Sequence, residues 1–173
     1  YMTSAFLHSE LLAVKLAYEQ TNNHDLAAID YLEKIFLTAK APLELRQAAI
    51  KLGSRFIKTV QSLPLPSIDD NFYRYISQSR LHAHPIAYGV FCSAADIALP
   101  DSCLHYIYAQ AASLINTCVK SIPLSQTSGQ QILRSCSVQW PQLLDKLHSL
   151  SIDDFCLSTP GFDIRAMQHE TLY

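Results

Sequence analysis

Apolar side chains recur every three or four residues along most of this chain, the spacing that places them on one face of an α-helix. The first such stripe consists of Leu7, Leu11, Val14 and Tyr18. No window alternates apolar and polar residues for more than a few positions, so the sequence indicates no β-strand. The periodicity therefore predicts an all-α fold.

Prolines and short polar turns divide the chain into about eight predicted helices. We expect them over residues 2–20, 25–39, 42–63, from 67 onward, 85–97, 100–122, 125–149 with a break at 140–141, and 164–172. Asp25, Ser67 and Ser125 are predicted to cap the helices that they precede. Gly53 lies inside the third helix, where it predicts a close helix crossing. No linker interrupts the pattern, so residues 1–173 are expected to form one domain.

The charge composition excludes several classes of protein. Charged residues are only 16% of the chain, below the roughly 25% of ordinary soluble domains, and this shortage favours a surface that binds a partner. Lys and Arg number 13 against 15 Asp and Glu, so no basic excess is available for nucleic acid. No apolar run is long enough to cross a membrane, and no signal peptide is recognisable at the N-terminus. We therefore expect a cytoplasmic protein without nucleic-acid or membrane partners.

Signatures of catalysis are missing from the sequence. The glycines at 53, 89, 129 and 161 are too far apart to build a phosphate-binding loop, and no nucleophile motif occurs. Five cysteines without a CxxC pair predict buried reduced thiols rather than a zinc site. His82 and His84 are a candidate metal pair, although no carboxylate or thiol lies nearby in sequence. The competing interpretation is that His84 closes the turn before Pro85. We expect a binding protein and not an enzyme.

Several motifs, taken in order, resemble one family. Residues 84–89 read His-Pro-Ile-Ala-Tyr-Gly, residues 122–130 read Ile-Pro-Leu-Ser-Gln-Thr-Ser-Gly-Gln, and residues 163–173 read Asp-Ile-Arg-Ala-Met-Gln-His-Glu-Thr-Leu-Tyr. An E-L-R and a G-x-R pattern precede them. The positions that carry the resemblance include Glu44, Arg46, Gly53, Arg55, His84, Pro85, Gly89 and Pro123. Over essentially the whole chain this set resembles the UreF family of urease accessory proteins, without the family's N-terminal segment and extreme C-terminal tail.

The resemblance implies a non-catalytic maturation factor. It implies an all-helical homodimer that joins the accessory protein UreD, called UreH in some systems, and recruits the GTPase UreG to deliver nickel to apo-urease. Nickel and GTP would then be handled by the partner proteins, and this chain would hold no cofactor. The alternative is a direct nickel chaperone with His82 and His84 as ligands, including the case in which the pair is completed across a dimer.

Three surfaces are candidates for these contacts. The helix over 100–122 is predicted to form the core and the dimer seam, through Leu104, Tyr108, Ala111 and Ile115. A polar run is predicted to face a partner or line a channel near the dimer axis, through Gln126, Thr127, Gly129 and Gln130. Its competing interpretation is a plain helix cap. The chain end is predicted to become ordered on a partner, through Met167, His169, Glu170 and Tyr173.

Overall fold

The computed structural model describes residues 3–40, 42–66, 68–155 and 164. Its helices are α1 (Leu12–Asn22, after a π-helical turn at Leu7–Leu11), α2 (Leu26–Ala39), α3 (Leu43–Ser62), α4 (Asp70–Gln78), α5 (His84–Ala94), α6 (Leu99–Ser121), α7 (Gln126–Ser137) and α8 (Trp140–Ser149). A 3-10 turn follows at Ile152–Asp154. The described residues include no strand, and the predicted all-α, single-domain fold is confirmed.

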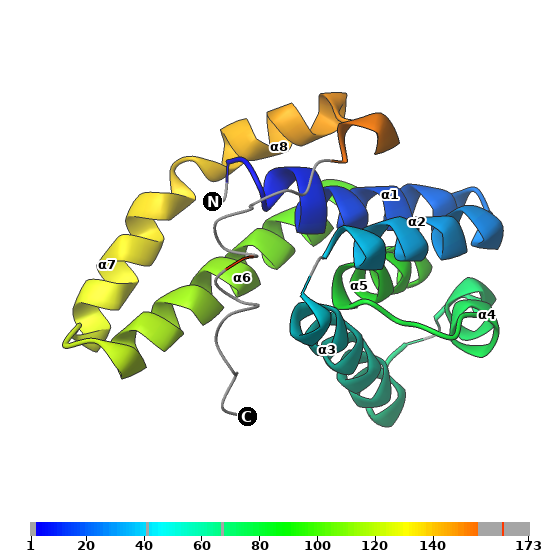
Figure 1. The fold of residues 1–173 in the computed structure, drawn as a ribbon, viewed down its shortest axis with the longest axis horizontal. Coiled ribbons are helices and arrows are strands. Elements are labelled where there is room, and N and C mark those ends of the chain that lie inside the picture. The colour runs from blue at the N-terminus through cyan, green and yellow to red at the C-terminus, as the bar shows by residue number, and fades with distance from the viewer. Residues whose placement is uncertain (1–2, 41, 67, 156–163, 165–173) are drawn as a thin grey trace.

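The helices divide into a body and an arm (Figure 1). In the body, α5 packs against α1, α3 and α4, α2 packs on α1, and α8 packs against α6 and the π-helical turn that precedes α1. Helix α6 begins in the body and continues beyond it, and α7 folds back along its far half. We call residues 111–138 the arm and the remaining described residues, apart from 164, the body.

Helix α5 is the centre of the body. Ile86, Ala87 and Val90 have no exposed area, which fits a helix that is apolar all round. Gly89 lies where α1 crosses, because a Cβ at this position would overlap the carbonyl oxygen of Val14. A close approach does occur at Gly53, where a Cβ would overlap the backbone carbonyl of His82, but this carbonyl lies before the start of α5 and not within a helix as predicted. The segment that approaches Gly53 is the one leading into α5.

Local signals set several helix starts correctly. The Asp25 side chain accepts a hydrogen bond of 2.9 Å from the backbone N–H of Ala28, and Ser125 accepts one of 3.0 Å from Ser128. Helix α4 begins later than predicted, with Asp69 as its capping residue. The predicted cap Ser67 lies outside the described residues. At Trp140 the break is complete, and a separate helix begins there with Pro141 in its first turn.

A buried lysine joins the first and last helices of the body. The Nζ of Lys15 donates to the backbone carbonyls of Leu147, His148 and Leu150 at 3.3, 3.2 and 2.7 Å. These carbonyls lie at the end of α8, where intrahelical donors run out and a positive charge complements the helix dipole. Lys15 therefore fixes the end of α8 on α1.

The cysteines differ between the two regions. Cys92 and Cys103 are buried in the body, as predicted, whereas Cys118 and Cys136 on the arm are exposed, so the prediction is wrong for that pair. Cys156 lies outside the described residues. No helix in the described ranges is long and apolar enough to cross a membrane.

Candidate protein-binding surface

The arm has a small core of its own. Ala111 and Ile115 of α6 pack against Leu133 of α7, separately from the main core of the body. Gly129 lets α7 approach closely, because a Cβ there would lie 3.0 Å from a methyl of Val119 and 3.1 Å from one of Ile115. This cluster is small for two helices of this length, so much of the arm's apolar surface is left uncovered.

Large apolar side chains remain exposed along the arm and the adjoining part of α6. They are Leu104, Tyr108, Leu114, Ile122, Ile132 and Val138. The ring of Tyr108 meets that of Trp140 edge to face, with centroids 6.1 Å apart. A groove of about 160 Å³ opens between α6, α7 and α8, and its lining includes Leu114, Ile132 and Trp140. Exposed apolar side chains gathered around a groove are typical of protein-binding sites.

The predicted dimer seam is only half available on this surface. Leu104 and Tyr108 are exposed, 36% and 50% respectively, and stay candidates for contact with a second subunit. Ala111 and Ile115 are instead buried under α7 of the same chain, because α6 has two apolar faces and α7 covers one of them. Leu114 is the exposed apolar neighbour that a second subunit could reach.

The polar run at the start of α7 presents three side chains to solvent. Gln126, Thr127 and Gln130 are exposed, and none of them makes a side-chain hydrogen bond within the described part of the chain. Ser125 alone supplies the helix cap. Gly129 is buried and faces α6, so the close backbone approach that it allows is within the chain. A partner-facing role for the three exposed residues stays a prediction.

The tail carries the third predicted contact surface. Met167, His169, Glu170 and Tyr173 lie outside the described residues. The continuous description ends at Phe155, whose ring packs edge to face against Phe36 of α2 at 6.2 Å. The last continuously described residue therefore lies beside α2.

The two candidate metal ligands lie in different aromatic surroundings. His84 packs against Phe56 and Tyr106, with centroids 5.7 Å away in both cases, whereas His82 meets Tyr75 at 5.1 Å. Burial lowers the pKa of both imidazoles. Within the described ranges no three His, Cys, Asp or Glu side chains gather as a metal site. The placement of His84 agrees with a packing role at the turn into α5.

The other positions that carry the family resemblance lie at helix starts, in a turn and on α3. Pro85 is buried in the first turn of α5. Glu44 is exposed in the first turn of α3, where a negative charge is favourable, and Pro123 is exposed in the turn between α6 and α7. Arg46 is half-buried, with an Nε that has no acceptor among the described residues, and Arg55 is exposed.

Sequence reasoning missed a buried carboxylate at Glu33. Its Oε1 accepts hydrogen bonds from the Ala83 backbone N–H at 2.6 Å and the Tyr75 hydroxyl at 3.1 Å, and its Oε2 accepts one from the Ser79 hydroxyl at 3.0 Å. Burial raises the pKa of Glu33 to about 7, against the opposing effect of these hydrogen bonds. The carboxyl group thereby fixes the segment between α4 and α5 on α2.

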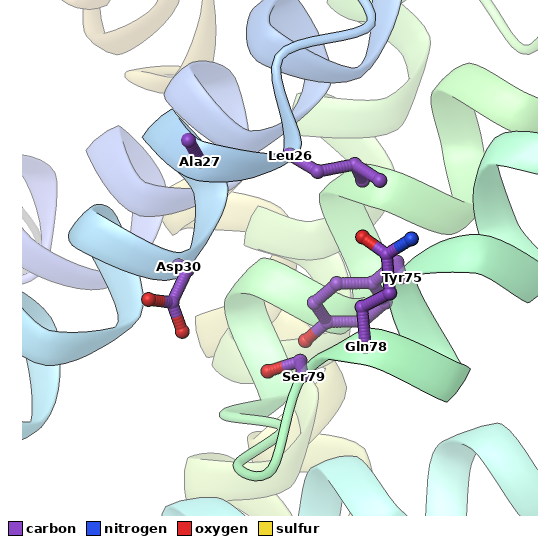
Figure 2. Close-up of a pocket in the computed structure, with 6 residues that line it drawn as sticks. All are labelled: Leu26, Ala27, Asp30, Tyr75, Gln78 and Ser79. Atoms are coloured by element: carbon purple, nitrogen blue, oxygen red, sulfur yellow. The ribbon is translucent and has the colours of Figure 1, made fainter.

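A cavity of about 310 Å³ lies between α2 and α4 (Figure 2), and its lining includes Tyr75 and Ser79, which both donate hydrogen bonds to Glu33. Leu26, Ala27 and Asp30 line one side, and Tyr75, Gln78 and Ser79 line the other. The sequence does carry a signal for Glu33, because it lies four residues after buried Ile29 and four before buried Leu37. A charged residue within an apolar stripe points to a buried polar contact.

Comparison with known proteins identifies the family. The chain matches the UreF family over residues 1–137. It is 30% identical to the urease accessory protein UreF of Arthrobacter sp. (strain FB24) over 166 residues, covering 94% of this chain and 70% of that relative. Identity is 26% to UreF of Lachnoclostridium phytofermentans, covering 100% and 76%, and 24% to UreF of Sporosarcina pasteurii, covering 100% and 86%. The chain therefore belongs to the UreF family of urease accessory proteins.

Proposed function

We propose that this chain is a cytoplasmic adaptor in urease maturation. It binds UreD, called UreH in some systems, and recruits the GTPase UreG, so that nickel enters apo-urease. The observation that carries the proposal is the arm, whose apolar side chains extend beyond the body without cover from the described part of the chain. Surface of this kind suits a protein that acts by holding others together.

The proposal includes a homodimer whose seam lies on α6. Leu104 and Tyr108 share one face of that helix, and Leu114 is an exposed apolar side chain in the part of α6 that belongs to the arm. Tyrosine suits an interface because its ring can be buried while its hydroxyl still finds a hydrogen-bond partner.

Nickel and GTP are assigned to the partner proteins in this proposal. The glycines are too scattered for a phosphate-binding loop. The direct nickel-chaperone alternative gains no support from His82 and His84, since the two rings pack against different aromatic neighbours. Equilibrium dialysis should find no tight stoichiometric nickel site on the isolated chain.

Co-purification tests the adaptor role. The full chain should retain UreD or UreH, and through that complex UreG, whereas deletion of residues 163–173 should weaken retention of UreD or UreH because the tail is expected to become ordered on that partner. Failure of the full chain to retain either partner would overturn the adaptor proposal. Unchanged retention after the deletion would remove the tail from it.

The variant Tyr108→Asp tests the seam. A charge at the centre of an apolar interface should convert the dimer to a monomer in sedimentation velocity. Tyr73→Asp on α4 is the matched control, because Tyr73 is 49% exposed against 50% for Tyr108 and also makes an edge contact with a neighbouring ring. If the Tyr108 variant sediments like the control, the seam lies elsewhere.

A further inference from the structure

The outward face of α3 carries a concentration of positive charge in a chain with more acids than bases. Residues 45–68 contain no Asp or Glu, yet they include Arg46, Lys51, Arg55 and Lys58. Lys51, Arg55 and Lys58 are spaced by four and three residues, so they share one helix face, and all three are exposed. None of them forms an ion pair with another residue in the described ranges.

Two exposed leucines lie beside this charge. Leu45 and Leu52 are seven residues apart, which places them in line along α3, and Thr59 continues the line. Lys51 and Lys58 have the same spacing and flank the line on one side. Leucines in line with lysines flanking them are the pattern by which one helix of a coiled coil selects a partner helix with acidic flanking positions.

No helix of the described chain covers this face. Helix α3 packs mainly on α5, through the side that carries Gly53, Ile57 and Val60. Helix α3 lies at the edge of the body (Figure 1). The proposed dimer seam is on a different helix, α6. The surface is therefore distinct from the arm and from α6.

We propose that the outward face of α3 binds an acidic amphipathic helix of another protein. This basic face consists of Leu45, Lys51, Leu52, Arg55 and Lys58. The leucines supply the apolar contact, and the three cations supply electrostatic selection and faster association. Nucleic acid fits less well because the chain as a whole has a net charge of −2. A membrane surface fits less well because the face has no aromatic side chain and only two apolar ones.

A pair of designed peptides tests the proposal on the full chain. Both are helices of about three heptads with leucine in the apolar positions, one with glutamate and the other with lysine in the flanking positions. Amide chemical shifts of the isotope-labelled protein should change along α3 on addition of the glutamate peptide. The lysine peptide should leave α3 unchanged. Added salt should weaken binding of the glutamate peptide, since exposed charge pairs are screened.

Variants separate the basic face from the charge of the whole protein. Lys51→Glu with Lys58→Glu should weaken binding of the glutamate peptide about tenfold or more, because attraction becomes like-charge repulsion. Lys120→Glu with Lys146→Glu makes the same change in net charge outside α3 and should bind like the native chain. Thermal melting checks that both variants are folded.

Three results would overturn the proposal. One is a set of shift changes located on the arm instead of α3. Another is equal loss of binding in the two double variants. The third is binding to vesicles of anionic phosphatidylglycerol through Lys51 and Lys58 without binding to the glutamate peptide, which would assign the face to a membrane surface.

Discussion

Helix α5 and the arm show two different ways of burying apolar residues. Around α5, the side chains of Ile86 and Val90 have no exposed area, and neighbouring helices approach to backbone contact at Gly89. The arm buries a cluster of three side chains and leaves Ile132 and Val138 in solvent. The packing around α5 is closed, whereas the arm leaves apolar side chains without cover from the described part of the chain.

Buried polar groups follow the same division. Lys15 and Glu33 each make three hydrogen bonds inside the body. Every buried polar or charged side chain among the described residues lies outside the arm. Satisfied buried polar groups fix one arrangement of neighbouring helices, because misalignment leaves them without partners. The arm lacks such constraints, which suits a surface that must fit a partner.

The largest expected effect comes from the glycine at the α3 crossing. Gly53→Ala should destabilise the fold by about 4 kcal/mol, because the added methyl overlaps a backbone carbonyl that cannot move alone. Gly129→Ala is the matched change in the arm. There the methyl meets only side-chain methyls at 3.0 and 3.1 Å, and the gain in helix propensity offsets the contact, so the change should stay within about 1 kcal/mol. Urea unfolding measures both, and equal losses would contradict the division between body and arm.

A smaller effect should appear as a pH dependence of the body. The raised pKa of Glu33 means that the folded state holds this proton between the unfolded value of 4.5 and about 7. Since the folded state binds more protons there, raising the pH through this range favours unfolding. As the pH rises from 4.5 to about 7, the free energy of unfolding of the native chain should fall by about 3 kcal/mol relative to that of Glu33→Gln. Above that range the difference between the two proteins should stay constant.

Unfolding curves at several pH values measure this difference. Glu44→Gln is the control, because the Glu44 side chain is exposed on α3 and makes no contact with the cavity beside α2. The control should follow the native chain throughout the range. A constant difference between native and Glu33→Gln proteins would show that the carboxyl group does not retain its proton in the fold.

The smallest effect is expected on the arm surface. Val138 is 71% exposed, so Val138→Ser should change the stability of the isolated chain by no more than about 0.5 kcal/mol. Val90→Ser in α5 makes the same chemical change at a fully buried position and should cost about 3 kcal/mol. A comparable loss for both, measured at a concentration where the chain is monomeric, would mean that the arm surface is already covered within the chain.

The features that sequence predicted well depend on local chemistry. Asp25 and Ser125 cap helices through residues three positions away, and α5 is apolar on every face whatever surrounds it. Gly53 was informative because glycine destabilises the interior of a helix, so its presence there indicates a close approach by another part of the chain. Each of these depends on a short stretch of chain, so a short stretch was enough to predict it.

The features that sequence missed depend on residues far apart in the chain. Lys15 meets carbonyls at residues 147–150, and Glu33 meets donors at 75–83, so neither partner is visible in a local pattern. Periodicity also marked Ala111 and Ile115 as apolar without showing which neighbour covers them. The structure shows that α7 does, and that the exposed surface of α6 lies at Leu104, Tyr108 and Leu114.

The Lys15 contact also has a mechanical consequence. Lys15 fixes the backbone at Leu150, five residues before Phe155. His8 makes a further contact of 3.1 Å with the carbonyl oxygen of Asp154. A partner that pulls on the chain beyond Phe155 therefore transmits its load to the first helix of the body and not only to the last turn of α8. Tension applied to the segment after α8 is therefore borne by α1 and by the turn that precedes it.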